Sequence, residues 1–160
     1  MTAERILFLD VDGVLNSVGS VLALGGPSDC LDPVSVGLVA RLCRETGAKI
    51  VVSSTWRIGR DVERLKEELA RAGAPQLAEF IIDKTDTVPG IRGKQIARWL
   101  EANDFSGRYV IVDDDSDMLP EQKPYFVQTC YADGFRARHY TDAMAILDPK
   151  HADSQIIVPA

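Results

Sequence analysis

Short apolar runs separated by amphipathic segments dominate the chain. The apolar runs cover residues 6–9, 49–53, 80–82, 109–112 and, more weakly, 125–129. Continuous apolar runs of this length are typical of strands that are buried on both faces of a parallel sheet. Between them, apolar residues recur at helical spacing over residues 33–46, 60–72, 94–102 and 140–147. This alternation predicts an α/β fold in which helices cover both faces of a mostly parallel, doubly wound sheet.

Turn and cap residues divide this pattern into its elements. Asp32 and Pro33 form a favourable helix start, because the acid can act as N-cap and proline is well tolerated in the first turn. Gly47 ends the same helix. Residues 16–31 are rich in glycine, serine and proline, and connections of this length in compact domains are often functional. We expect this segment to form a loop or a flap.

The composition favours one domain without a membrane anchor. The chain has 160 residues, of which 46% are hydrophobic, so we expect a domain over residues 1–148 and an irregular tail over 149–160. No stretch approaches the roughly 18 consecutive apolar residues of a membrane span, and the N-terminus has no secretory pattern. We therefore expect a cytoplasmic protein.

Cysteine content and net charge narrow the classes of function. Cys30, Cys43 and Cys130 are odd in number and not spaced as a metal cluster, so we expect reduced, mostly structural thiols. The formal net charge of −6 argues against sequence-independent binding along nucleic acid, which depends on many contacts from Lys and Arg to phosphates. It leaves a nucleic-acid end open as a substrate.

Polar residues gather where the apolar runs end. Asp10 and Asp12 follow the first run, with a turn at Gly13, and Ser53 and Ser54 follow the second. Four acids follow the run at 109–112, namely Asp113, Asp114, Asp115 and Asp117. Ligands of open α/β sheets bind outside the carboxyl ends of the strands, and carboxylates that repel one another there can share a hard cation such as Mg²⁺. Together with a basic residue, Arg92 or Lys94, this set suits phosphoryl transfer.

Four strings in the sequence carry a family resemblance. FLDVDG, VVSS, RGK and VIVDDDSD occur in this order and resemble the four motifs of the haloacid dehalogenase (HAD) superfamily of phosphohydrolases over nearly the whole chain. The strings SSTWR, RGKQIARWL and YVIVDDDSDM are similar to the HAD phosphatase-like domain associated with RNA repair proteins. The resemblance implies a three-layer, Rossmann-like HAD fold and a Mg²⁺-dependent phosphatase that acts on phosphomonoesters.

The resemblance also implies roles for individual residues. Asp10 matches the nucleophile that forms an aspartyl-phosphate, and Asp12 matches the general acid and base, whose backbone carbonyl faces the metal. Ser53 matches the hydroxyl that hydrogen-bonds the phosphoryl oxygens, although the double serine leaves Ser54 as an alternative. Lys94 is the preferred cation of the third motif, and Arg92 is the alternative in a different alignment.

Metal and substrate contacts complete the predicted site. Asp114 matches a direct Mg²⁺ ligand and Asp113 the adjacent acid, so the predicted metal-binding residues are Asp10, Asp12, Asp113 and Asp114. The candidates for phosphate or substrate contacts are Ser54, Arg57, Arg92 and Gly13. Simpler roles are expected for three neighbours: Asp115 as a turn acid, and Trp56 and Trp99 as packing residues. Capping the next helix is as good an explanation of Ser54 and Thr55 as a role in the site.

The chain has no room for a cap domain, which bears on the substrate. Residues 16–31 can form only a loop or a flap, and the segment between Ala74 and Gly90 is similarly short, so we expect an open site. In the family, an open site usually accompanies a large substrate, such as a protein or nucleic-acid end, or a cap from another subunit. The expected partner is thus a phosphorylated small molecule or macromolecular end, and the oligomeric state stays open.

Three alternatives to a general phosphatase remain. The first is an end-processing phosphatase for RNA or DNA termini, which an exposed basic track at Arg57, Arg60 and Arg64 would support. The second is a phospho-receiver module, but receivers place paired acids after the first strand and the phosphorylated Asp after the third, unlike this chain. The third is an inactive HAD-like binding module, against which the intact acids argue.

Overall fold

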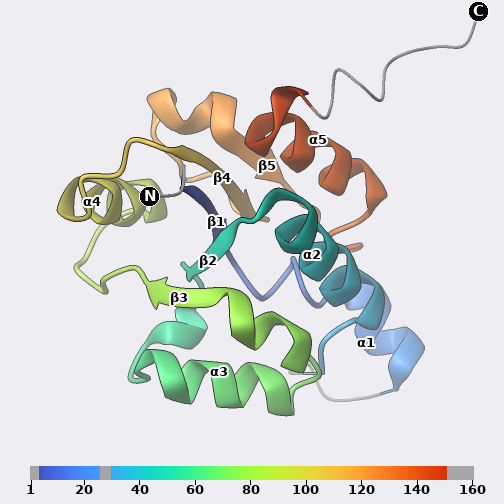
Figure 1. The fold of residues 1–160 in the computed structure, drawn as a ribbon. Helices are drawn as coiled ribbons and strands as arrows, with labels where there is room; N and C mark the ends of the chain where they lie inside the picture. Colours follow the sequence, from blue (N-terminus) through green and yellow to red (C-terminus); the bar gives the residue numbers. More distant parts are fainter. Residues whose placement is uncertain (1–3, 26–29, 151–160) are drawn as a thin grey trace, which may run out of the picture.

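A five-stranded sheet forms the centre of the protein in a computed structural model that describes residues 4–25 and 30–150. The strands are β1 (Arg5–Leu9), β2 (Lys49–Val52), β3 (Ile81–Lys84), β4 (Arg108–Asp113) and β5 (Phe126–Gln128). They pair in the order β3-β2-β1-β4-β5, and all four pairings are parallel. The predicted α/β fold with a parallel sheet is therefore confirmed (Figure 1).

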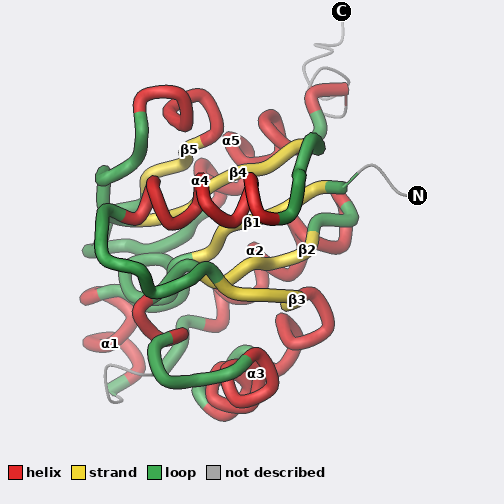
Figure 2. The backbone as a smooth tube through the Cα atoms, turned by 90° about the vertical axis from the view of Figure 1, so that its left-hand side faces the viewer, coloured by secondary structure: helices red, strands yellow, loops and turns green. Residues whose placement is uncertain are grey.

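Helices cover both faces of this sheet. The α-helices are α1 (Val18–Leu24), α2 (Pro33–Thr46), α3 (Val62–Arg71), α4 (Arg92–Ala102) and α5 (Ala137–Leu147). Three short 3₁₀ helices join them: η1 (Thr55–Arg57), η2 (Pro75–Phe80) and η3 (Pro120–Tyr125). Figure 2 shows α4 in front of the sheet, with α2 and α5 behind it and α3 beside the β3 edge. This is the three-layer arrangement that the sequence pattern predicts.

Strand β1 lies between two apolar layers because its successive side chains point to opposite faces. Leu7 and Leu9 belong to the larger core cluster, while Ile6 and Phe8 belong to a second cluster under α4. The ring of Trp99 meets Phe8 edge-on, with the two centroids 5.4 Å apart. Each such side chain contributes about 1.5–3 kcal/mol through burial, so the strand is anchored on both faces. The carboxyl end of β1, which is followed directly by Asp10, is therefore held firmly in place.

Some element boundaries differ from the sequence-based expectation. Helix α1 forms within residues 16–31, where we expected a loop or flap, because Ser17 and Ser20 make a reciprocal capping box and Gly25 closes the helix with φ +65°. Helix α4 begins at Arg92 rather than Lys94. The backbone N–H groups of Arg92 and Gly93 donate to Asp117, at 3.1 Å each, and this distant residue takes the place of a local cap.

Other differences are small or concern residues outside the described part. Helix α5 begins three residues earlier than predicted, and α3 and β3 are displaced by one or two residues. Residues 26–29 of the predicted flap and residues 151–160 of the predicted tail lie outside the described residues. Within residues 4–25 and 30–150, neither of the two expected insertion points holds a separate cap domain. No helix in these residues has the length and apolar character needed to cross a membrane.

The order of the strands in the sheet changes direction at the boundary between the neighbouring strands β1 and β4. Strands β1, β2 and β3 extend the sheet to one side, and β4 and β5 extend it to the other. Backbone pairing continues one residue past the strands, because Asp10 N–H donates to Val112 O at 3.1 Å and Ser53 N–H to Leu9 O at 3.0 Å. Asp10, Ser53 and Asp113 therefore stand side by side at the switch point, where open α/β sheets bind their ligands.

Candidate active site

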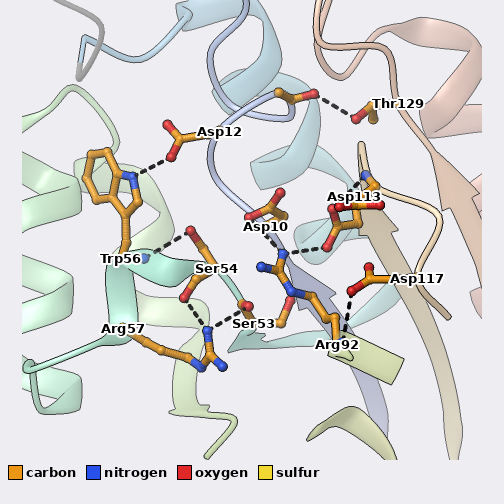
Figure 3. A network of polar contacts seen from close by, with 12 residues as sticks. Asp10, Asp12, Ser53, Ser54, Trp56, Arg57, Arg92, Asp113, Asp117 and Thr129 are labelled. Atoms are coloured by element: carbon orange, nitrogen blue, oxygen red, sulfur yellow. Dashed lines mark hydrogen bonds and ion pairs between the residues drawn. The ribbon is translucent and has the colours of Figure 1, made fainter. Parts of the chain in front are cut away.

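Arg92 joins two buried carboxylates at this switch point. Its Nη1 lies 2.6 Å from Asp113 Oδ2 and 3.1 Å from Asp10 Oδ1 (Figure 3). The two acids come from β1 and β4, and the arginine comes from the first turn of α4. Lys94 is exposed, and within the described part of the chain its side chain makes no ion pair or hydrogen bond with these acids. The geometry therefore favours Arg92 over the predicted Lys94 as the cation of the site.

Three carboxylates converge in a way that suits a metal ion. Asp10, Asp113 and Asp114 each offer an oxygen, and these oxygens lie within 4.8 Å of one another. Gly13 allows the close approach of Asp114: its φ is +80°, and a Cβ at this position would lie 2.5 Å from Asp114 Oδ2. A set of carboxylate oxygens of this kind is preferred by hard cations such as Mg²⁺. The structure thus brings together three of the four predicted metal-binding side chains.

The electrostatics of the cluster also fit a cation. Burial and the neighbouring Asp113 carboxylate raise the pKa of Asp10 to about 8, although Arg92 acts in the opposite direction. Burial raises the pKa of Asp113 as well. One guanidinium therefore does not fully compensate two buried carboxylates. A divalent cation among Asp10, Asp113 and Asp114 would supply the missing positive charge.

Asp12 lies apart from the cluster of Asp10, Asp113 and Asp114. Its Oδ2 accepts a hydrogen bond from the indole Nε1–H of Trp56 at 3.2 Å, and its Oδ1 accepts one from Asn16 Nδ2–H at 2.9 Å. Figure 3 shows the Asp12 carboxylate turned toward Trp56, on the side away from Arg92 and Asp113. Its side chain is thus not a fourth ligand beside the other three. The predicted contact of its backbone carbonyl with the metal stays a prediction.

The two adjacent serines have different surroundings. Ser54 Oγ accepts a hydrogen bond from Trp56 N–H at 3.2 Å and caps η1, as the sequence allowed. Ser53 Oγ is buried and has no hydrogen-bond partner among the described residues. Since buried polar groups are nearly always paired, the Ser53 hydroxyl is the one that still requires a partner. This difference favours Ser53 for the phosphoryl contact, which remains a prediction.

Arg57 supports the backbone of the site, contrary to the expectation that it contacts substrate. All five guanidinium N–H groups are accounted for by protein oxygens. The acceptors are Ser53 O, Ser54 O, Thr85 O, Asp86 O and Gln95 Oε1. Arg57 is only 3% exposed, so it cannot be part of an exposed basic track with Arg60 and Arg64. It ties the end of β2 to the segment after β3 and so fixes both serines.

Sequence reasoning missed several polar residues at the site. Thr85 and Thr129 follow β3 and β5 directly; Thr129 Oγ1 donates to Gly13 O at 2.7 Å, and the buried Thr85 Oγ1 has no partner among the described residues. The strand-end rule that identified Asp10 would also have found both threonines. Asn16 and Trp56 had no comparable signal, because their pairing with Asp12 depends on how the loops fold.

Comparisons with known proteins identify a family model and a solved structure that are similar to this chain. A family model described as "HAD domain in Swiss Army Knife RNA repair proteins" matches residues 6–140, a range that includes every site residue described above. Among solved structures, the chain is similar to a haloacid dehalogenase-like hydrolase from Streptococcus pneumoniae, with 13% sequence identity and a TM-score of 0.49. That similarity covers 94% of this chain and 93% of the other. The search of curated proteins gave no match.

Proposed function

The chain belongs to the family of HAD domains in Swiss Army Knife RNA repair proteins, and we propose that it is a Mg²⁺-dependent phosphatase that hydrolyses phosphomonoesters through an aspartyl-phosphate on Asp10. Membership of the family identifies it as a HAD-type hydrolase. The observation that supports the more specific proposal is the position of Asp10 at the switch point, beside Arg92 and the acids Asp113 and Asp114. These groups supply the nucleophile and the positive charge that phosphoryl transfer requires.

In the first step, an Asp10 carboxylate oxygen attacks the phosphorus of the substrate. A bond forms between this oxygen and phosphorus while the bond from phosphorus to the leaving oxygen breaks. Asp12 donates its proton to the departing oxygen, so the product leaves as a neutral alcohol. Arg92 and the hydroxyl of Ser53 stabilise the charge on the transferring group. The guanidinium of Arg92 is held in place by its ion pairs with Asp10 and Asp113, and Arg57 holds the backbone of Ser53.

In the second step, water attacks the phosphorus of the aspartyl-phosphate. Asp12, now a carboxylate, takes a proton from this water while the bond between Asp10 and phosphorus breaks. Inorganic phosphate leaves, and both aspartates return to their starting states. Asp10, Asp113 and Asp114 would hold the Mg²⁺, which when bound neutralises charge on the nucleophile and on the phosphoryl oxygens.

Phosphate release from a panel of substrates tests this proposal. The panel contains p-nitrophenyl phosphate, nucleotides and oligonucleotides with terminal phosphates, each assayed with Mg²⁺ and with EDTA. Mg²⁺-dependent turnover supports the phosphatase. A phosphorylated protein that does not turn over would instead identify a receiver-like module, and the absence of both phosphorylation and turnover would favour a binding domain.

A nucleic-acid end is the second candidate substrate. The description of the matching family refers to RNA repair proteins, and the described residues contain no cap domain that would exclude a large substrate. The expected basic track does not add support, because Arg57 is buried and Arg64 pairs with Glu68 at 2.9 Å. A preference for terminal phosphates of oligonucleotides over mononucleotides in the panel would favour this candidate.

Replacing Ser53 should mainly lower activity, whereas replacing Ser54 should mainly lower stability. We expect Ser53→Ala to lower kcat roughly 10²-fold through loss of a donor to the transferring group, while the free energy of unfolding changes by less than about 0.5 kcal/mol. Ser54→Ala removes the cap of η1 and should cost about 1 kcal/mol of stability with a smaller loss of activity. Steady-state kinetics and urea unfolding measure both effects. The reverse pattern would assign the phosphoryl contact to Ser54.

The stabilising effect of Mg²⁺ should increase with pH. The pKa of Asp10 rises from 3.8 to about 8 on folding, so the metal-free protein holds this proton more tightly than the unfolded chain does. Its contribution to stability is present in acid and is lost as the pH rises toward 8. Mg²⁺ binds the ionised form, so the increase in melting temperature caused by Mg²⁺ should grow between about pH 5 and pH 8.

Thermal melts with Mg²⁺ and with EDTA across this pH range measure the effect, and Asp10→Asn is the control. The variant lacks the Asp10 carboxylate, so its response to Mg²⁺ should be smaller and should depend less on pH; the remaining dependence comes from Asp113, whose pKa burial also raises. An equal, pH-independent response in both proteins would show that Asp10 does not contribute to the metal site.

A further inference from the structure

The carboxylate of Asp12 is held from two sides by neutral donors. Asn16 Nδ2–H donates to Oδ1 at 2.9 Å, and the indole Nε1–H of Trp56 donates to Oδ2 at 3.2 Å. The three residues come from two separate segments, the turn after β1 and η1 after β2. Asn16 is buried and Trp56 is half-buried, so both hydrogen bonds are partly shielded from water. Each oxygen of the carboxylate therefore has its own fixed donor.

Both donors are themselves fixed by the surrounding structure. Asn16 Oδ1 accepts a hydrogen bond from Gly13 N–H at 3.0 Å, which sets the orientation of its amide group. The backbone N–H of Trp56 donates to Ser54 Oγ, and Arg60 Nη1–H donates to Trp56 O at 2.8 Å. The indole ring also packs against the larger core cluster. The position of Asp12 is thus determined by the fold and not by a flexible surface contact.

The contrast with Asp10 shows what this arrangement can do. Asp10 is paired with the charged guanidinium of Arg92, whereas Asp12 receives two uncharged donors and lies on the other side of the nucleophile (Figure 3). A carboxylate has about four lone-pair sites, so two donors leave sites free for a leaving group or a water molecule. Two donors also fix the plane of the carboxylate, which sets the direction of proton transfer.

We propose that Trp56 is a positioning residue that, with Asn16, holds Asp12 in the orientation from which it protonates the leaving group. This inference rests on the proposed function, since it concerns the first step of the same reaction. Trp56 acts through Asp12 and does not itself exchange a proton. Its contribution is then largest for substrates whose leaving oxygen needs protonation most.

A second tryptophan in the chain provides a matched control. Trp99 Nε1–H donates to Asp83 Oδ2 at 2.8 Å, so this residue makes the same kind of indole-to-carboxylate hydrogen bond. Asp83 lies on β3, and Trp99 packs in the second core cluster, away from Asp12. The variants Trp56→Phe and Trp99→Phe both remove one N–H donor and keep an aromatic ring. Trp56→Phe removes a donor from Asp12, whereas Trp99→Phe removes a donor from Asp83.

The experiment compares kcat/KM for p-nitrophenyl phosphate, which has a good leaving group, with kcat/KM for phenyl phosphate, which has a poor one. This parameter covers the steps up to departure of the leaving group, so the second step does not obscure it. We expect Trp56→Phe to lose roughly 10-fold with phenyl phosphate and less than about twofold with p-nitrophenyl phosphate. Trp99→Phe should change both values by the same factor.

Asn16→Ala provides an independent second variant. It removes the donor to Asp12 and the acceptor of Gly13 N–H without adding a charge beside Asp12, and it should show the same selective loss with phenyl phosphate. Circular dichroism establishes that each variant is folded. Equal losses with both substrates in folded Trp56→Phe, or an identical pattern in Trp99→Phe, would overturn the inference while leaving the phosphatase intact. Failure of the wild-type protein to hydrolyse either ester would overturn both.

Discussion

Asp10→Asn is expected to lower turnover by roughly 10³-fold or more while the protein remains folded. The asparagine amide has nearly the shape of the carboxylate but cannot attack phosphorus to form an acyl phosphate. The substitution also removes one of two buried carboxylates that share a single guanidinium, at 3.1 Å from Asp10 and 2.6 Å from Asp113. The metal-free variant should therefore be at least as stable as the wild type near pH 8, where the raised pKa of Asp10 disfavours folding most.

The measurement combines steady-state kinetics with trapping of the phosphorylated enzyme. Wild type quenched during turnover should contain an acid-stable, alkali-labile phosphate, and Asp10→Asn should not. Asp115→Asn is the matched control: Asp115 is an exposed acid in the same segment, and its side chain accepts a hydrogen bond from Ser116 N–H at 2.7 Å. If Asp10→Asn kept near wild-type turnover in a preparation free of wild-type enzyme, the nucleophile would have to be another residue.

The sheet and the position of Asp10 could be predicted because both depend on short-range patterns. An apolar run buried on two faces identifies β1, and the first polar residue after it must lie at the carboxyl end. The same reasoning located Ser53 and Asp113. It required only that parallel strands end at one edge of the sheet, which the alternation of strands and helices already implied.

The choice of cation could not be predicted in the same way. Helix α4 begins at Arg92 because the backbone N–H of that residue donates to Asp117, which lies 25 positions later in the chain. Nothing in the neighbourhood of Arg92 signals this acceptor, and the periodic apolar positions fit a start at Lys94 equally well. A shift of two residues in the helix start changes which basic side chain faces the acids.

The role of Arg57 could not be predicted either, because several of its hydrogen-bond acceptors also lie far away in the sequence. Its acceptors include the carbonyl of Thr85, 28 positions away, and that of Asp86 on the same segment. An arginine after a strand-end serine is equally compatible with a phosphate contact and with a bond to backbone carbonyls. Only the path of the chain after β3 decides between them, and this path has no local sequence signature.

Replacing Arg92 should strongly lower both stability and turnover. The same replacement of Lys94 tests which of the two basic residues is the cation of the site. Arg92→Met leaves Asp10 and Asp113 buried without their shared cation, so we expect a loss of about 3–5 kcal/mol in the free energy of unfolding of the metal-free protein. Turnover should fall roughly 10²- to 10³-fold, because a fixed positive charge beside the transferring group is lost. Lys94→Met removes an exposed charge and should change stability by less than about 0.5 kcal/mol.

The stability loss in Arg92→Met should itself depend on pH and on Mg²⁺. Without the guanidinium, the pKa values of Asp10 and Asp113 rise further, so protonation relieves the repulsion in acid and the loss becomes greatest in alkaline solution. Mg²⁺ should recover part of the stability, since its charge replaces that of the arginine, but it should not restore turnover to the same extent. Urea unfolding at several pH values, with Mg²⁺ and with EDTA, separates these effects. If Lys94→Met lost turnover and Arg92→Met kept it, Lys94 would be the functional cation, and the ion pairs of Arg92 would serve the fold alone.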